Sequence, residues 1–299
     1  MNITPCAGHQ VGVRITGLDT RTGGDMHAVI AQLHRHKLVI LKDQQLNEQQ
    51  FCDLSRALGD PVPYLQQNYH HPDHPLIFVS SNIKKDGRSM GVARTGGYWH
   101  SDTSFLASPV PLTLLYPQVI PTQSRRTTLF IDMERVYGAM PVSMRTRLDS
   151  ARFIHSGKWK YKVRKEDVGL DLSEILALIH QVQPPVLHPA VITHPATGAR
   201  MLYGSRGFTV GIEGWSSDEA EAFLDEVFTF AERPEFIEEF QWELGDIILW
   251  DNRCFAHKAG RLAHANDPVK GDIQTEEETL VYRIILNDRL PLSASGPAS

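Results

Sequence analysis

Short runs rich in β-branched and aromatic residues recur along the chain, and they constrain the fold more than any other feature. Each run is bounded by polar or turn-forming residues, as β-strands usually are. The predicted strands are Leu76–Ser80, Leu112–Gln118, Thr127–Met133, Val186–Thr193, Arg200–Tyr203, Asp246–Trp250 and Thr279–Asn287. Strands of this kind bury one face against a second sheet, so the pattern favours a β-sandwich or jelly roll.

Helical spacing is confined to a few segments between these runs. Gly24–Arg35 and Ser217–Ala231 have amphipathic spacing, and Asn47 is a typical N-cap for one more helix. Further strands are predicted at Val11–Ile15 and Lys37–Leu41. The predicted fold class is therefore mixed α/β and mainly β, with a double-stranded β-helix (jelly-roll) core, flanking helices and insertions.

The length of 299 residues allows one large domain or two, because a domain commonly contains about 100–200 residues. Two pieces look like linkers: a polar stretch at about 264–278 and a Ser/Pro/Gly-rich tail at 293–299. Both lie near the C-terminal end, so neither divides the chain into comparable parts. We expect a single domain over residues 1–299, with the first piece a loop insertion and the second a flexible tail.

Composition and charge limit the classes of partner. The N-terminal residues lack an apolar stretch preceded by basic residues, and no apolar run approaches the roughly 20 residues that span a bilayer. The formal net charge is −5, with no basic stripe of the kind that binds a nucleic-acid backbone. We expect a cytoplasmic protein with no membrane or nucleic-acid partner, and homo-oligomerisation is left open.

Histidine is abundant and cysteine is scarce, which directs attention to a particular kind of metal site. The chain has fourteen histidines and three cysteines. The cysteines are too few and too scattered for a disulfide framework or a thiolate zinc cage. A metal, if one is bound, is therefore expected to have histidine and carboxylate ligands.

The segment His100-Ser101-Asp102 has the spacing of two such ligands. In a strand, residues i and i+2 point to the same face, so the imidazole and the carboxylate could reach one ion. Two histidines and a carboxylate form the facial triad that holds Fe(II) with open coordination positions. His257, after a buried strand and a polar turn, is the predicted third ligand. Taken singly, each of these residues is more often an ordinary polar side chain than a metal ligand.

A charge in the middle of an apolar strand points to an anion. Arg283 lies within Leu280–Leu286, where an unpaired guanidinium would be costly. A guanidinium pairs well with a carboxylate through two parallel hydrogen bonds. The carboxylate could belong to a bound small molecule or, alternatively, to a protein acid in a buried salt bridge.

Together these residues resemble the taurine dioxygenase-like (TauD/TfdA) family of Fe(II)- and 2-oxoglutarate-dependent oxygenases. The resemblance is carried by Trp99–Asp102, Thr127–Met133, His194–Gly198, Trp250–His257 and Arg283. It implies an enzyme that uses O2, with iron held by His100, Asp102 and His257. It also implies Arg283 on the distal carboxylate of 2-oxoglutarate, assisted by Thr128.

The interval from His257 to Arg283 is longer than such relatives usually have. The polar stretch at 264–278 accounts for it as a surface insertion, which costs little thermodynamically. Arg261 and Arg289 are the alternative arginines, but both lie in poorer settings.

The chain also resembles the isonitrile-forming branch of this family at Val79–Asn82, Tyr116–Pro121 and Gly207–Glu213. Those enzymes oxidise the N-carboxymethyl group of a 3-(carboxymethylamino) fatty acid to an isonitrile, with decarboxylation. The resemblance implies that the carboxylates of such a substrate contact Lys162, Arg164, Tyr64 and Tyr69, with Arg126 at the mouth of the site.

Several positions depart from that branch. Leu65 replaces an expected second tyrosine. Gly260 and Arg261 replace the polar residues that the branch has just after the second histidine ligand. Thr103–Phe105 matches the pattern of the general family, so it does not favour the branch. Without the resemblance, the basic segment around Lys162 reads as a solvated strand edge. The alternative activity is therefore a hydroxylase of another carboxylate- or sulfonate-bearing small molecule.

Two further interpretations concern residues near the predicted site. A non-catalytic binding protein could keep the ligands as a structural zinc site, with Cys254 as the nearby thiol. His70, His71 and His74 could form a polar lid over the substrate site. Asp251 and Asn252 are expected to brace the loop that carries His257.

Overall fold

The computed structural model describes residues 1–85, 87–93, 95–121, 126–161, 167–261 and 277–293. Lys162 and Arg164 lie outside the described residues. So do most of the predicted insertion at 264–278 and all of the predicted tail except Ser293.

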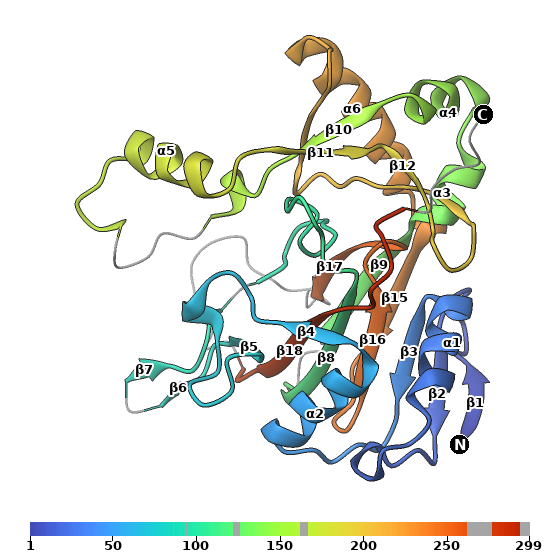
Figure 1. Cartoon of the computed structure of the whole chain (residues 1–299), viewed down its shortest axis with the longest axis vertical. Coiled ribbons are helices and arrows are strands. Elements are labelled where there is room, and N and C mark those ends of the chain that lie inside the picture. Colours follow the sequence, from blue (N-terminus) through green and yellow to red (C-terminus); the bar gives the residue numbers. More distant parts are fainter. Residues whose placement is uncertain (86, 94, 122–125, 162–166, 262–276, 294–299) are drawn as a thin grey trace.

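A large sheet forms the lower half of the molecule as drawn in Figure 1. Its strands, in spatial order, are β1 (Asn2–Pro5), β2 (Val13–Thr16), β3 (Leu38–Leu41), β16 (Ile247–Asp251), β8 (Leu112–Val119), β18 (Leu280–Asn287) and β4 (Asp60–Val62), and β5 (Phe78–Ser81) also pairs with β18. Neighbours are antiparallel except for β2 and β3.

Smaller sheets complete the β-structure. Their strands are β15 (Ile237–Gln241), β9 (Arg126–Asp132) and β17 (Phe255–Arg261) in one; β11 (Val186–Pro189), β10 (Arg152–His155) and β14 (Thr209–Ile212) in a second; and the pairs β12 (Val191–Thr193) with β13 (Arg200–Leu202) and β6 (Lys84–Lys85) with β7 (Arg88–Ser89). The sheet containing β9 matters most for function, because β17 carries His257.

Helices flank these sheets. They are α1 (Met26–His36), α2 (Glu48–Leu58), α3 (Met133–Ala139), α4 (Val142–Asp149), α5 (Leu172–Val182) and α6 (Ser217–Ala231), with 3-10 turns at Thr20–Thr22, Gln67–Tyr69, Lys158–Lys160 and Pro234–Phe236. The predicted cap is present: the Asn47 side chain accepts from the backbone N–H of Gln50, and the Gln50 side chain accepts from that of Asn47.

The central strands of the large sheet separate two apolar cores because their side chains alternate. Ile247 and Leu249 of β16 pack with residues of α1 and α2, whereas Ile248 and Trp250 face the second core, which includes Phe130 of β9. Alternation with a period of two is the expected consequence of the pleat. The second face is the one that carries the candidate site.

The mixed α/β class with many strands agrees with the sequence-based prediction, but the predicted strand Val186–Thr193 is wrong as a single element. It is divided into β11, which pairs with β10, and β12, which pairs with β13. The division falls at the buried Ala190, whose N–H donates to the carbonyl of Ala151 beside β10 while its own carbonyl accepts from the N–H of Tyr203 beside β13.

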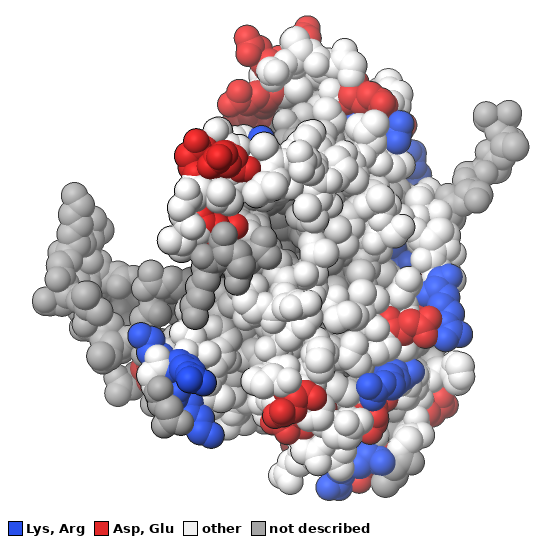
Figure 2. Space-filling model, turned by 60° about the vertical axis from the view of Figure 1, so that its left-hand side comes forward, with Lys and Arg blue, Asp and Glu red and all other residues white. Residues whose placement is uncertain are grey.

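On the face drawn in Figure 2, Lys and Arg side chains form separate groups among acidic and uncharged surface. Within the described parts of the chain, no helix has the length and apolar character required to cross a membrane.

Candidate metal and cofactor site

His100 and His257 are held together by their own backbones. They form an isolated antiparallel bridge, in which each N–H donates to the carbonyl of the other at 3.0 and 2.7 Å. The predicted strand through Asp102 is wrong: after His100 the chain turns at Asp102–Phe105. Thr103 has φ +57°, and its hydroxyl accepts from the backbone N–H of Val110 at 2.7 Å, which fixes the turn.

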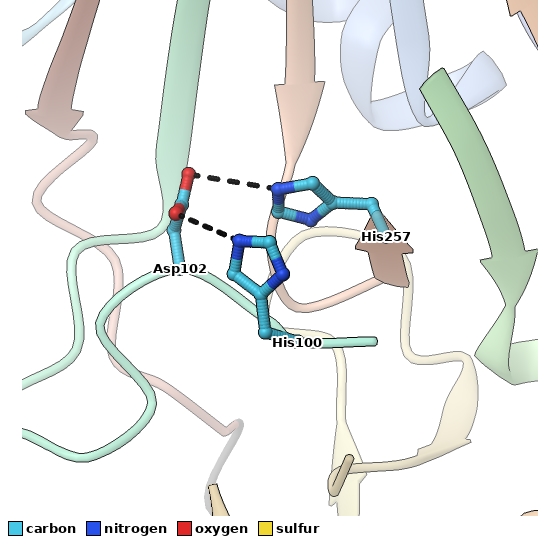
Figure 3. A group of neighbouring side chains, drawn as sticks. All are labelled: His100, Asp102 and His257. Atoms are coloured by element: carbon cyan, nitrogen blue, oxygen red, sulfur yellow. Dashed lines mark ion pairs between the residues drawn. The ribbon is translucent and has the colours of Figure 1, made fainter. Parts of the chain in front are cut away.

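The turn still brings Asp102 to the two imidazoles (Figure 3). Asp102 Oδ1 is 3.7 Å from Nε2 of His100, and Asp102 Oδ2 is 3.9 Å from Nε2 of His257. One ligand atom from each residue lies within 4.8 Å of the others, and all three side chains are buried. The structure therefore brings the three predicted ligands to one point.

The hydrogen bonds and burial favour neutral, metal-binding imidazoles. His100 Nδ1 is 2.8 Å from the carbonyl oxygen of Tyr98, so it carries the hydrogen and leaves the Nε2 lone pair available. Burial lowers the pKa of His100. Burial, reinforced by His100, lowers the pKa of His257 to about 3. Both rings stay uncharged at neutral pH, the form in which histidine binds a metal.

Asp102 stays ionised despite its burial. Burial alone would raise its pKa, but the guanidinium of Arg283, followed by His257 and His100, brings the pKa well below its ordinary value. Arg283 Nη1 donates to Oδ1 at 2.8 Å, and the Thr113 hydroxyl donates to Oδ2 at 2.8 Å. An anionic oxygen ligand beside two neutral nitrogens suits a divalent cation.

A cavity of about 110 Å³ opens onto the two histidines. His100, His257, Thr128 and Arg283 all line it. The Nε of Arg283 is buried and has no hydrogen-bond partner among the described residues. A buried donor without a partner is costly, so an additional acceptor beside this guanidinium would be favourable.

The rest of the cavity wall is mainly apolar. It includes Leu115, Val119, Ile120, Trp242 and Val281. Its polar members include Arg283 and the hydroxyl-bearing residues Ser80, Thr95, Thr127 and Thr128. A mainly apolar wall with a few polar groups is typical of small-molecule sites.

The predicted substrate tyrosines lie against Arg283 but outside the cavity lining. Tyr64, Tyr69 and Phe78 form an aromatic cluster with ring centroids 4.6 to 5.4 Å apart. The guanidinium carbon of Arg283 is 4.1 Å from the centre of the Phe78 ring and 5.4 Å from that of Tyr64. Burial raises the pKa of both tyrosines, that of Tyr69 to about 12, so both remain hydroxyl donors.

The other predicted side chains are placed less directly. The backbone of Arg126 begins β9 opposite Arg261, but neither side chain is described. Arg289 pairs with Asp60 at the surface. His71 contacts Tyr282, on the face of β18 opposite to Arg283.

Asp251 and Asn252 brace the loop that carries His257, as predicted. Asp251 accepts hydrogen bonds from the guanidinium of Arg253 and lies 3.0 Å from His194 Nε2. The same guanidinium also pairs with Asp288. Asn252 contacts Ser101 and Thr113. Arg253 and Thr113 were not predicted, although a threonine inside the apolar run Leu112–Leu114 is a visible irregularity.

Cys254 does not join the three ligands as the zinc interpretation requires. It lies near His194 and Asp251 instead, forming a second group of potential ligands. In that group His194 Nε2 already contacts Asp251, and His194 Nδ1 accepts from the backbone N–H groups of Ala196 and Thr197. These bonds give His194 a structural role in its turn.

Comparison with known proteins agrees with a β-rich fold that carries two histidines and a carboxylate at one point. The model of the taurine catabolism dioxygenase TauD, TfdA family matches residues 2–269. The chain belongs to this family. It is an Fe(II)- and 2-oxoglutarate-dependent dioxygenase, with O2 as the other substrate.

Its relatives differ in what they act on. It is 27% identical to pentalenolactone F synthase of Streptomyces arenae, over 86% of this chain and 89% of that protein. It is 24% identical to an alpha-ketoglutarate-dependent sulfate ester dioxygenase of Pseudomonas putida, over 100% and 93% of the two chains. It is 26% identical to an (S)-phenoxypropionate/alpha-ketoglutarate-dioxygenase of Sphingobium herbicidovorans, over 83% and 84%.

The fold is shared with solved structures. A taurine dioxygenase from Burkholderia xenovorans superposes with a TM-score of 0.72 at 25% identity, covering 97% of this chain and 92% of that one. AAD-2, solved with Mn(II) and N-oxalylglycine, superposes with the same TM-score of 0.72 at 22% identity, over 97% and 98%.

Proposed function

We propose that His100, Asp102 and His257 hold the Fe(II), and that Arg283 and Thr128 bind the distal carboxylate of 2-oxoglutarate. The observation that carries this assignment is the shared cavity, in which Arg283 and Thr128 face the same space as the two imidazoles. The unpartnered Nε of Arg283 supports it, because a carboxylate would supply the missing acceptor.

The bound metal and 2-oxoglutarate supply, with O2, the oxidation of a substrate C–H bond, while 2-oxoglutarate loses CO2 and becomes succinate. The protein contributes positioning and the exclusion of water. His100 and His257 offer neutral nitrogen donors, and Asp102 offers a charge that Arg283 and Thr113 keep in place. The apolar walls keep competing solvent out of the cavity.

The proposed substrate is a small anionic molecule, contacted by Lys162, Arg164, Tyr64 and Tyr69, with Arg126 at the mouth of the site. Two relatives are named for anionic compounds, a sulfate ester and phenoxypropionate. Tyr64 and Tyr69 lie beside Arg283 and keep their hydroxyl hydrogens, which suits hydrogen bonding to an anion.

Within this class we propose oxidation of the N-carboxymethyl group of a 3-(carboxymethylamino) fatty acid to an isonitrile. The alternative, hydroxylation of another carboxylate- or sulfonate-bearing molecule, is equally consistent with the compounds in the names of the relatives. A mass spectrum after incubation with an N-carboxymethyl-3-amino fatty acid separates the two. Loss of the carboxymethyl carboxylate with retention of nitrogen supports the isonitrile; gain of one oxygen supports hydroxylation.

The architecture proposed for this enzyme is a single domain over residues 1–299 with a jelly-roll core. Supporting it, β16, β8 and β18 of the large sheet and β9 and β17 of the smaller sheet all contribute residues to the cavity wall. We also propose a cytoplasmic location and leave its oligomeric state to measurement in solution.

Succinate formation tests the assignment. The protein is incubated with Fe(II), 2-oxoglutarate and a panel of carboxylates and sulfonates, and succinate is measured for the wild type, His100→Ala and His180→Ala. His180 is exposed on α5, so its variant controls for the loss of an imidazole as such. We expect succinate from the wild type and His180→Ala only. Equal turnover by His100→Ala would overturn the ligand assignment.

A further inference from the structure

Thr113 places a hydroxyl group against the metal-ligand carboxylate from the centre of the large sheet. It lies on β8, is fully buried, and donates to Asp102 Oδ2 at 2.8 Å. Its neighbours Leu112 and Leu114 pack in the helix-covered core. Because side chains alternate along a strand, Thr113 points to the opposite face, where the site lies.

The direction of this hydrogen bond follows from the groups behind it. The indole N–H of Trp250 only donates, and it is 2.9 Å from Oδ1 of Asn252, so that atom must be the amide oxygen. The amide nitrogen of Asn252 is then 2.9 Å from Oγ1 of Thr113. The oxygen of Thr113 therefore accepts, and its single hydrogen is available to Asp102.

These hydrogen bonds also connect the two segments that carry the metal ligands. The carbonyl oxygen of Asn252 accepts from the hydroxyl of Ser101 at 2.6 Å, next to Asp102. Asn252 itself lies in the turn between β16 and β17, and β17 carries His257. Thr113, Asn252 and Trp250 are all buried, so solvent does not compete for these bonds.

We propose that Thr113 is a positioning residue for the metal centre: the one-way series of donors Trp250, Asn252 and Thr113 sets the orientation of the Asp102 carboxylate and thereby the affinity for the metal. The inference rests on the ligand set proposed above. A carboxylate rotates through broad wells about its last torsion, so its plane needs fixing from outside. Arg283 fixes Oδ1 but also faces the cofactor cavity, whereas Thr113 contacts Oδ2 and does not line that cavity.

The test measures Mn2+ binding to the full-length protein without 2-oxoglutarate. Free Mn2+ is followed by electron paramagnetic resonance for the wild type, Thr113→Val, Thr113→Ala and Thr113→Ser. Thr20→Val is the matched control, because Thr20 is also buried and its hydroxyl donates to Gln44 at 2.7 Å. Unfolding midpoints and the visible absorption of the Co2+-loaded proteins are recorded alongside, to separate loss of fold from a changed ligand set.

Loss of an outer hydrogen bond to a metal ligand commonly costs about 10- to 100-fold in affinity. We expect that loss for Thr113→Val and Thr113→Ala, with an altered Co2+ spectrum. Thr113→Ser, which retains the hydroxyl, should stay within about threefold of the wild type. Thr20→Val should stay within about twofold, because distant sites act independently.

Two results would overturn the proposal in distinguishable ways. If the wild type binds Mn2+ and the folded Thr113→Val and Thr113→Ala variants bind it equally well, Thr113 has no positioning role and the ligand assignment survives. If the wild type itself binds no Mn2+, the proposed ligand set and this inference fail together. Should Thr113→Val fail to fold, the comparison of Thr113→Ala with Thr113→Ser decides.

Discussion

Nη1 of Arg283 donates to Oδ1 of Asp102 at 2.8 Å, while Nε of the same guanidinium is buried without a partner among the described residues. The sequence allowed two interpretations of Arg283, an anion-binding residue or half of a buried salt bridge. The structure shows that one side chain has features of both. Its salt bridge neutralises the carboxylate beside the imidazoles, and the same residue also lines the cavity.

The first prediction concerns this guanidinium. Replacing Arg283 by Gln should raise the KM for 2-oxoglutarate about 10- to 100-fold at saturating Fe(II), because a charge-assisted hydrogen bond contributes about 1.5–3 kcal/mol. Lys should give a smaller rise, since it keeps the charge but not the planar fork. Succinate formation against 2-oxoglutarate concentration measures both. Arg289→Gln, which removes an exposed partner of Asp60, is the control. An unchanged KM in Arg283→Gln would exclude Arg283 as the cofactor-binding arginine.

Thr128 should contribute less. Its hydroxyl is neutral, so Thr128→Val should weaken 2-oxoglutarate binding by about fivefold, the equivalent of about 1 kcal/mol. Thr128→Ser should bind nearly as well as the wild type. Calorimetric titration of the Mn2+-loaded protein with 2-oxoglutarate measures the three affinities. Equal losses for Ser and Val would indicate that packing, rather than the hydroxyl, matters at this position.

Arg253 should dominate the stability of the loop that precedes His257. It is 1% exposed and lies between Asp251 and Asp288. Burial lowers the pKa of the guanidinium, but the two carboxylates outweigh burial and raise that pKa above its ordinary value. Arg253→Met would remove the guanidinium that both acids share, and breaking a buried pair costs about 3–5 kcal/mol. Urea unfolding measures this loss.

The exposed pair Arg200–Asp149 provides the comparison for Arg253. Its side chains are 49% and 39% exposed, so Arg200→Met should change the free energy of unfolding by about 0–1 kcal/mol. Similar losses in the two methionine variants would show that the buried charges are compensated elsewhere.

His155 should make the protein less stable in acid. Its side chain is fully buried, neither ring nitrogen has a hydrogen-bond partner among the described residues, and burial lowers its pKa from 6.5 to about 3. Between these values the unfolded chain binds a proton that the folded protein does not. Stability from this group is therefore present above pH 6.5 and is lost as the pH falls towards 3.

The slope of stability against pH measures the effect. The contribution of His155 approaches about 1.4 kcal/mol per pH unit in the middle of that window. His155→Phe, which keeps a ring but cannot titrate, should show a correspondingly flatter dependence of the unfolding free energy on pH. Parallel curves for the two proteins would contradict the prediction.

The predicted ligands could be found from sequence because their signals are local. The spacing of His100 and Asp102 suggested a common face, and the charge of Arg283 in an apolar strand required a partner. The two side chains do not share a strand face, since a turn at Thr103 rather than a strand orients Asp102.

The supporting contacts could not be predicted because they join distant segments. Thr113 meets Asp102 and Asn252 only when β8 pairs with β16, in the register that places Thr113 opposite Trp250. Nothing in the residues around Arg253 identifies Asp288 as a partner. Such contacts depend on the packing of the whole sheet, and a single sequence gives no measure of it.

The alternation of β18 has a consequence for how this enzyme can diversify. Tyr282 and Ile284 belong to the helix-covered core, while Val281 and Arg283 between and beside them line the cavity. Inserting one residue here would exchange the two sets, exposing apolar side chains to the cofactor and burying a charge in the core. Insertions and deletions that alter the substrate range are therefore expected in loops outside the central strands, such as the segment from Tyr64 to Tyr69, whereas the strands themselves can change only by substitution.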